Sequence, residues 1–188
     1  MRNAPLMAVK RCIVFALGLT TGILPLRSAT LQRLSLDEMI TKSTAIVRAK
    51  VVDSYSAFSG PIVYTHYQLQ VSERFKGPHT ATVEVLVPGG VAGNTRQTFT
   101  GTPAFQPGDE FVFFLWTSPA GLTHVIGLTQ GLFSIPRGAG ADPVVTRAAS
   151  HEVMLDGKTG RQVRDQALAM RLSELRSRIA GTLAGAAQ

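Results

Sequence analysis

The strongest constraint in this sequence is the alternation of apolar and polar residues in "IVYTHYQLQVSERF", residues 62–75. Alternate positions carry the large apolar side chains Val63, Tyr67, Leu69, Val71 and Phe75. A period of two places successive side chains on opposite faces of an extended chain. The stretch therefore predicts a long β-strand with one face in the core and the other face toward solvent.

Other segments repeat this pattern. The turn "KGPH" leads to "TATVEVLV", residues 80–87, whose valines alternate with an outward Glu84, so we expect an antiparallel hairpin. Residues 45–51 also alternate, and "SAFSGP", residues 56–61, is expected to break that strand. "FVFFLW", residues 111–116, is apolar throughout, which predicts a strand that is buried on both faces.

Helical signals occur only near the two ends of this β region. Ser35 and Glu38 form a capping-box pattern before a short helix. A terminal helix is predicted from Val163 to Leu183, and its apolar stripe contains Leu168, Leu172, Leu175 and Ile179. The predicted fold class is mainly β: a small antiparallel OB-like barrel with a short N-terminal helix and a C-terminal amphipathic helix. A two-sheet β-sandwich is the alternative.

The first 29 residues have the layout of a secretory signal peptide. Basic residues in "MRNAPLMAVKR" precede the uncharged run "CIVFALGLTTGILPL" and the small residues of "RSAT". The predicted domains are therefore a signal peptide at 1–29, a β-barrel domain at 30–160, and a C-terminal helix at 161–188 that is packed on the barrel or appended to it. We expect an exported protein, periplasmic or extracellular, that meets a membrane only through an uncleaved signal segment.

Removal of that segment changes the charge and the cysteine content. Four of the 19 basic residues but none of the 12 acidic ones precede position 30, so the remainder has 15 basic against 12 acidic groups, a net charge of about +3. Such a weak excess without a basic cluster argues against nucleic-acid binding. The single cysteine, Cys12, leaves with the signal peptide, so no disulfide or thiol nucleophile is expected in the mature protein.

The glycines in "VPGGVAGN", residues 87–94, follow a predicted strand, as in phosphate-binding loops. A dinucleotide fingerprint would need a glycine where Pro88 stands, and a helix should follow, whereas "TRQTFTG" has no helical period. A P-loop would need a closing Gly-Lys-Ser/Thr. Gly89, Gly90 and Gly93 are therefore predicted to connect strands and not to cradle phosphate.

No motif in the sequence assembles a catalytic or metal site. The histidines, His66, His79, His124 and His151, are dispersed, and "HE" at 151–152 lacks the second histidine of a zinc protease. A G-x-S-x-G nucleophile elbow is missing. We therefore expect no cofactor and no enzyme activity, although a hydrolase with a dispersed site stays an alternative.

One polar surface is a candidate for binding. Tyr64, His66, Gln68 and Gln70 share the face of the 62–75 strand that points away from the core. A polar stripe with an aromatic member suits a peptide or glycan, and a solvated strand face is the alternative.

Five phrases resemble a family of uncharacterised exported bacterial domains: "STAIVRAKVVDSYS", "YTHYQLQVSERFKGP", "VEVLVPGG", "GTPAFQPGDEFVFFL" and "VIGLTQGLFSI". They fall within residues 35–136. "KG" before a valine-rich strand, and Phe-x-Pro-Gly before the apolar one, are also similar to the netrin-like, OB-type modules of tissue inhibitors of metalloproteinases. Those inhibitors act through an N-terminal cysteine and disulfides, which the mature chain lacks, so no functional residue carries over.

These observations predict a non-catalytic binding or interaction module with a protein, peptide or glycan partner in the bacterial envelope. A protease inhibitor or protease-associated domain is a second possibility, which the netrin-like resemblance suggests. The hydrolase alternative requires a concave pocket that gathers two carboxylates, or a histidine with a carboxylate.

Overall fold

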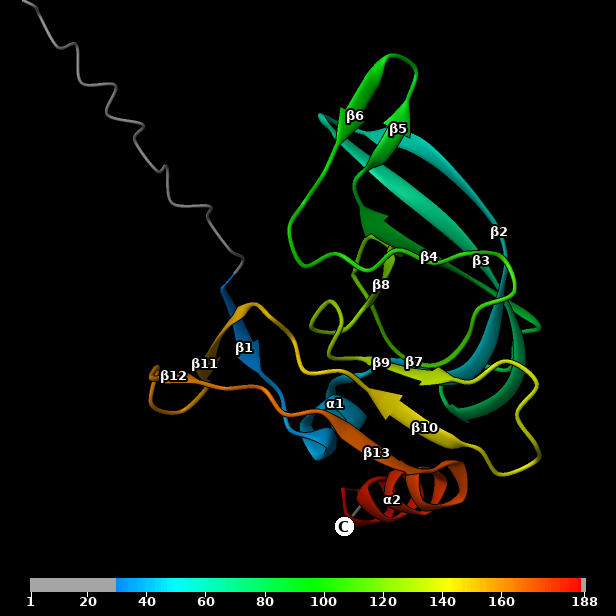
Figure 1. Ribbon diagram of the computed structural model, residues 1–188, viewed down its shortest axis with the longest axis vertical. Helices are drawn as coiled ribbons and strands as arrows, with labels where there is room; N and C mark the ends of the chain where they lie inside the picture. The colour runs from blue at the N-terminus through cyan, green and yellow to red at the C-terminus, as the bar shows by residue number, and fades with distance from the viewer. Residues whose placement is uncertain (1–29, 187–188) are drawn as a thin grey trace, which may run out of the picture.

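A long antiparallel hairpin of β2 (Ala45–Ser59) and β3 (Ile62–Lys76) runs through the computed structural model, which describes residues 30–186 (Figure 1). The signal peptide expected at 1–29 lies outside the described residues. β4 (Thr82–Pro88) pairs with the other edge of β3, with Gln68 opposite Glu84. The long strand predicted from the alternating pattern, and its hairpin with the next strand, are confirmed.

The main sheet has eight antiparallel strands, in the order β13-β10-β9-β7-β2-β3-β4, and β8 pairs with β7 beyond the end of β9. The remaining strands of this sheet are β7 (Glu110–Thr117), β8 (Thr123–Val125), β9 (Leu132–Ile135), β10 (Val144–Arg147) and β13 (Leu168–Arg171). A small sheet joins β1 (Thr30–Arg33), β11 (Val153–Asp156) and β12 (Gln162–Val163), and β5 (Gly90–Ala92) pairs with β6 (Thr95–Gln97).

The mainly β fold with two helices is confirmed, whereas the OB-like barrel is not. Within residues 30–186, the sheet stays open, because its edge strands β13 and β4 do not pair with each other. β13 leads directly into a helix, and β4 meets β8 partly through a side chain, where Nδ1 of His124 donates to the Leu86 carbonyl at 2.9 Å. The two ends of the sheet therefore lack the continuous ladder that closes a barrel.

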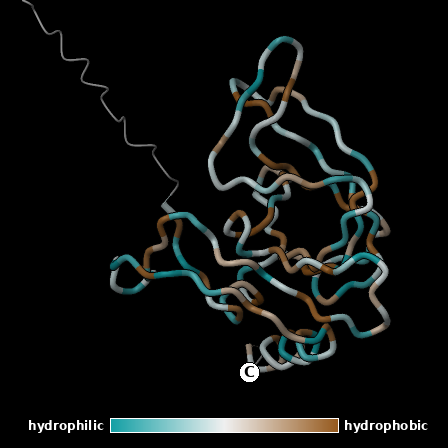
Figure 2. Tube along the Cα trace, viewed as in Figure 1, coloured by the Kyte–Doolittle hydropathy of each residue, from teal (hydrophilic) through white to brown (hydrophobic). Residues whose placement is uncertain are grey.

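The central strand β7 is buried on both faces from Val112 to Leu115, as its apolar run predicts, whereas Trp116 at the end of that run is exposed. Val112 and Phe114 pack toward the helices, while Phe113 and Leu115 pack into a second cluster on the opposite face, and all four are 0% exposed. Phe105, from the loop between β6 and β7, covers that second cluster and meets Phe113 edge to face, with ring centroids 5.6 Å apart. Figure 2 shows hydrophobic residues concentrated in the central strands.

The helices α1 (Leu36–Lys42) and α2 (Leu172–Gly185) cover one face of the sheet (Figure 1). The predicted capping box is confirmed: the Glu38 amide donates to Oγ of Ser35 at 3.2 Å, and the Ser35 amide donates to Oε2 of Glu38 at 2.8 Å. Among the described residues, no helix is long and apolar enough to cross a membrane.

The start of the C-terminal helix was predicted wrongly. Leu168 belongs to β13 and pairs with Arg147, so the helix begins at Leu172 and not at Val163. Pairing with β10 overrides the helical spacing of the leucines, and Asp142 accepts hydrogen bonds from the Ser173 amide and hydroxyl at 2.7 and 2.9 Å at the new start. The domain boundary at residue 160 stays a prediction.

The segment "SAFSGP" also differs from expectation. β2 continues through Ser59, which pairs with Ile62, so the turn is confined to Gly60 and Pro61. Cross-strand pairing with β3 outweighs the turn preference of serine and glycine here. Gln97 on β6 supports this turn, since it accepts from the Val63 amide at 2.8 Å and donates to the Pro61 carbonyl at 3.0 Å.

The glycines of "VPGGVAGN" connect strands, as predicted. β4 ends at Pro88, β5 begins at Gly90, and Gly93 lies in the turn between β5 and β6. The backbone angle φ is positive at all three glycines: +106° at Gly89, +133° at Gly90 and +55° at Gly93. These conformations are costly for residues with a Cβ, so the glycines have a structural role.

Candidate functional site

The predicted stripe on β3 divides into separate parts in the structure. His66 and Gln68 converge on Glu84 of β4, whose Oε1 lies 3.0 Å from Nδ1 of His66 and whose Oε2 lies 2.5 Å from Nε2 of Gln68. Tyr64 lies apart from them, with its ring 6.1 Å from that of His124. Gln70 is exposed and lies opposite Lys50 of β2 and Thr82 at the start of β4. The structure therefore brings together two of the four predicted residues.

Tyr55 of β2 completes this cluster, and its part was not predicted. Its ring stacks on His66, and its hydroxyl donates to Oε2 of Glu84 at 3.1 Å. Tyr55 was missed because it precedes a segment that was expected to end the strand. The outward position of Glu84 was recognised from the alternating pattern, but the register that sets it opposite Gln68 requires the paired strands.

The electrostatics of the cluster favour an ionised Glu84. The hydrogen bond with His66 is the largest influence that lowers the pKa of Glu84, and the bond from Tyr55 adds to it. Partial desolvation, followed by the same bond to Glu84, raises the pKa of Tyr55. Because an ionised carboxylate only accepts hydrogen bonds, Nδ1 of His66 carries the proton. These groups satisfy one another, as expected for a cross-strand network.

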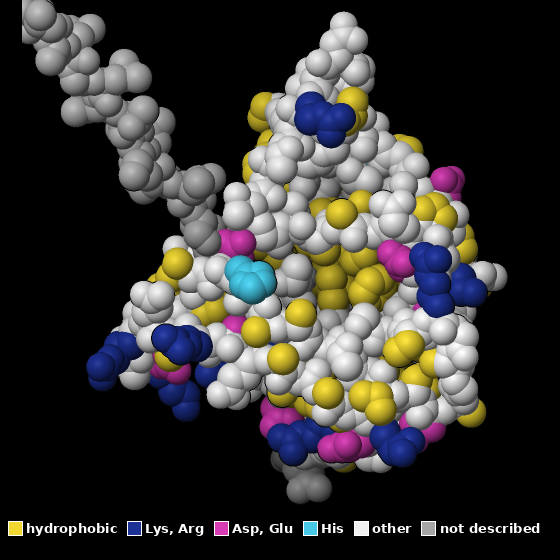
Figure 3. Space-filling model, viewed as in Figure 1, with side chains coloured by type: hydrophobic (Ala, Val, Ile, Leu, Met, Phe, Trp, Pro, Cys, Tyr) yellow, Lys and Arg dark blue, Asp and Glu magenta, His cyan; other side chains and the backbone are white. Residues whose placement is uncertain are grey.

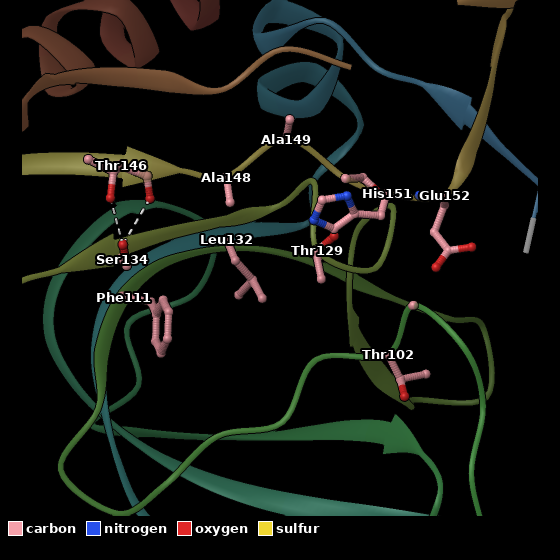
Figure 4. Close-up of a pocket in the computed structure, with 12 residues that line it drawn as sticks. Thr102, Phe111, Thr129, Leu132, Ser134, Thr146, Ala148, Ala149, His151 and Glu152 are labelled. Atoms are coloured by element: carbon pink, nitrogen blue, oxygen red, sulfur yellow. Dashed lines mark hydrogen bonds between the residues drawn. The ribbon is translucent and has the colours of Figure 1, made fainter. Parts of the chain in front are cut away.

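A cleft with a volume of 360 Å³ lies elsewhere on the sheet, between β9, β10 and the loop before β7. Figure 3 shows a hollow with hydrophobic side chains at its base, and Figure 4 shows the lining residues of the cleft in close-up. Its lining comes from five segments: Gly101 and Thr102, Phe111, Thr129 and Leu132, Ser134, and Thr146 with Ala148–Glu152. Residues far apart in the sequence therefore meet around one space.

The cleft combines apolar and polar walls. Phe111 and Leu132 supply apolar surface, and Oγ of Ser134 lies 3.0 Å from the carbonyl and 2.8 Å from the hydroxyl of Thr146 (Figure 4). His151 and Glu152 line another part of the wall. Such a mixture of apolar area and a few polar groups is typical of ligand sites, and the volume lies within their usual range.

Glycine at position 101 allows the two sides of the cleft to approach each other. A Cβ at Gly101 would lie 2.8 Å from Oε1 of Glu152, and its φ of +80° is itself unfavourable for other residues. Oγ of Ser150 accepts a hydrogen bond of 3.2 Å from the Glu152 amide. Gly101 therefore lies close to the Glu152 side chain, in a space that a larger residue would not fit.

The polar groups of the cleft do not form a nucleophile and base pair within the described part of the chain. The His151 ring has no hydrogen bond to another residue in 30–186, and Ser134 bonds only to Thr146. Residues 30–186 also contain no group of three His, Cys, Asp or Glu side chains that could hold a metal ion. The arrangement that the structure describes can bind a ligand through apolar contact and hydrogen bonds.

A larger hollow, of 470 Å³, lies near β1 and is lined by Leu31, Trp116 and Gln130 among others. Gln130 is 1% exposed, and its side chain is occupied in holding β1: Oε1 accepts from the Leu34 amide at 2.9 Å and Nε2 donates to the Gln32 carbonyl at 3.0 Å. The cleft beside β9 and β10 offers more polar groups, and we regard it as the stronger candidate.

Comparison with known proteins gives no match to a family model, to a curated protein or to a solved structure. The candidate site is therefore defined by geometry: a mainly β protein with a partly apolar cleft. The residues of that cleft were not predicted, because they come from five segments, from the loop at 101–102 to residues 146–152, which meet only in the folded chain. Ser134 and Thr146 are polar and alternate with buried neighbours on β9 and β10. This alternation could have been used to predict that both side chains face away from the core.

Proposed function

We propose that the protein is an exported, non-catalytic binding module whose ligand occupies the cleft beside β9 and β10. The observation that carries this proposal is the meeting of an apolar wall, Phe111 and Leu132, with the polar groups of Ser134, Thr146 and His151 around 360 Å³. The proposal of export rests on the signal-peptide pattern of residues 1–29. An exported protein would lie in the periplasm or outside the cell. The open, curved sheet is compatible with a sandwich-like architecture.

The proposed ligand is a compact group of a peptide or glycan that has one apolar face and one hydrogen-bonding edge. The apolar face would pack on Phe111 and Leu132, and the polar edge would face the Ser134–Thr146 pair or the His151 ring. A site of this kind selects by shape through its apolar wall and by orientation through its few polar groups.

Ligand-observed NMR with a set of small peptides and mono- and disaccharides tests the proposal. Ala148 is exposed and lines the cleft, so Ala148→Phe should fill it without disturbing the core. The matched control is Ala180→Phe, which adds the same side chain to the exposed face of α2. We expect binding to wild type and to Ala180→Phe and its loss in Ala148→Phe; equal binding to all three proteins would refute the proposal.

A hydrolase is the second candidate, because the cleft wall contains a histidine next to a carboxylate, His151 and Glu152. This candidate predicts turnover of ester, glycoside or peptide substrates that is lost in His151→Gln. Turnover that depends on His151 would replace the non-catalytic proposal. The protease-inhibitor alternative rests on the sequence resemblance alone and stays a prediction, which inhibition assays against secreted metalloproteases would test.

A further inference from the structure

A small sheet of three strands lies beside the main sheet (Figure 1). β1 pairs in parallel with β11, and β12 pairs antiparallel with β11. Gln130, from the loop before β9, donates to the Gln32 carbonyl at 3.0 Å and accepts from the Leu34 amide at 2.9 Å. The small sheet is therefore fixed to the rest of the protein through β1.

The net positive charge of the chain after residue 29 is concentrated on this small sheet. Its strands, the β11–β12 turn and the residue after β12, at 30–33 and 153–164, contain four basic residues and one acidic residue. Of the 15 basic and 12 acidic residues after position 29, the rest of the chain therefore has 11 of each. The whole excess of +3 lies on the small sheet, where Figure 3 shows Lys and Arg side chains gathered.

Four basic side chains are exposed on the small sheet, and we call them the basic patch: Arg33, Lys158, Arg161 and Arg164. None of them forms an ion pair with another residue in the part of the chain that the structure describes. Arg33 joins the other three only because β1 lies beside β11. The patch is therefore a feature of the folded chain.

The acidic residues in and next to this stretch are engaged with other groups. Asp156 accepts hydrogen bonds from the amides of residues 158 and 159, at 3.1 and 2.8 Å, within the β11–β12 turn. Oδ1 of Asp165 lies 2.8 Å from the buried Arg147, and the Glu152 side chain lines the cleft close to Gly101. The basic patch therefore has no carboxylate partner of its own and can attract an anionic surface.

The basic patch is close along the chain to the apolar run of the signal pattern. That run ends at Leu26, and β1 begins at Thr30, so the two are at most about 14 Å apart when the chain is fully extended. The headgroup layer of a bilayer takes up about 5–8 Å, and the Debye length at physiological ionic strength is about 8 Å. While the run is inserted in a membrane, β1 is therefore held within the range of the surface charge of the bilayer.

We propose that the basic patch binds the anionic lipid headgroups of the membrane that receives the apolar run. Each Lys or Arg beside a membrane segment strengthens binding to anionic lipid about fivefold. A single lipid chain needs a second signal, such as a polybasic patch, for stable membrane binding, and the basic patch adds such a signal to the apolar run. The proposal rests on the proposed export and does not depend on the ligand of the cleft.

Partition of the purified full chain into two kinds of vesicle tests the proposal: phosphatidylcholine alone, and equal parts of phosphatidylcholine and phosphatidylglycerol. The apolar run enters both kinds, so the ratio of the two partition coefficients, measured by sedimentation, isolates the attraction to anionic lipid. We expect a ratio well above one that falls as salt is raised, because salt screens exposed charges. A ratio near one at low salt overturns the proposal.

Two charge-matched double variants locate the attraction on the molecule. Arg161→Gln with Arg164→Gln removes two charges from the basic patch, whereas Lys50→Gln with Arg96→Gln removes two exposed charges on β2 and β6. We expect the ratio to fall about 25-fold in the first double variant and to change less than about twofold in the second. An equal fall in both, or an unchanged ratio in the first, overturns the assignment to the basic patch.

This measurement needs neither secretion nor a ligand in the cleft, so its failure is distinguishable from failure of the proposed binding function or of export. Binding of a short DNA duplex is measured with the same proteins. We expect weaker binding to DNA than to the mixed vesicles. Tighter binding to DNA that is lost in the Arg161→Gln and Arg164→Gln double variant would assign the patch to nucleic acid and overturn the lipid assignment.

Discussion

Tyr55 and His66 stack across the β2–β3 hairpin with their ring centroids 4.6 Å apart and their planes inclined by 11°. Both side chains also bond to Glu84 on β4, so three strands are joined on the face of the sheet away from the core. A cluster of this kind couples the stability of the sheet edge to the charge of one carboxylate.

Acid should weaken the fold through Glu84. Its pKa is lowered in the folded protein, chiefly by the His66 hydrogen bond, so its contribution to stability is present above its ordinary value of 4.5 and is lost as the pH falls through the lower folded value. Glu84→Gln should therefore reduce the difference between the free energies of unfolding at pH 7 and at pH 3, measured with urea. An unchanged difference would show that Glu84 is not stabilised by these bonds.

Gly90→Ala should destabilise the protein by about 1–3 kcal/mol, because φ there is strained for alanine. The added Cβ would also lie 2.5 Å from both Oγ of Ser56 and Oγ1 of Thr65. Gly181→Ala is the control with opposite sign: this glycine lies within α2 with open space around it, so alanine should stabilise by about 0.5–1 kcal/mol. Thermal unfolding of both variants tests these two expectations. A Gly90→Ala protein as stable as wild type would contradict the structural role of Gly90.

Phe105 should hold the loop before β7 in place. It is 4% exposed, and its ring lies 4.8 Å from Tyr67 and 5.3 Å from Phe111, which lines the cleft. Phe105→Ala should cost about 3–5 kcal/mol and Phe105→Leu less than about 1.5 kcal/mol. Hydrogen exchange should become faster around Thr102 in the alanine variant, and unaltered exchange there would show that the loop has another anchor.

The contact between α1 and α2 should depend on apolar packing more than on charge. Arg178 donates two hydrogen bonds to Asp37, at 2.8 and 2.6 Å, but both side chains are about half exposed, so solvent screens the pair. Leu175 is 0% exposed, and Leu175→Ala should cost about 2–5 kcal/mol. Asp37→Asn should lower the free energy of unfolding far less, and the reverse order in urea denaturation would contradict this ranking.

Short sequence patterns predicted secondary structure correctly where a single effect, such as burial or helix capping, determines the local conformation. The alternation of residues 62–75 and the apolar run 111–116 were confirmed as strands, and the Ser35–Glu38 cap is present as predicted. Each of these features depends on neighbours within a few residues or on burial of a whole segment. Such information is contained in a short window of sequence.

Features that depend on pairing between distant strands could not be predicted in this way. Leu168 has the spacing of a helix yet pairs with Arg147, and the region around Ser56 has turn residues yet extends along β3. The cleft likewise requires the folded chain, because Thr102, Ser134 and His151 meet only through the sheet order. For the same reason, the cluster around His66 and Gln68 was predicted only in part. Glu84 and Tyr55, which complete it, come from the neighbouring strands.

The most direct test of the proposed binding function is the methyl spectrum of Leu132 during titration with the tightest-binding peptide or saccharide. Leu132 lines the cleft and is 8% exposed, whereas Leu31 lines the hollow beside Trp116 and serves as the internal reference. We predict that the Leu132 methyl signals shift saturably, with the same Kd as the ligand signals, while those of Leu31 do not move. A saturable shift of the Leu31 methyl signals, with those of Leu132 unchanged, would contradict the assignment of the cleft as the binding site.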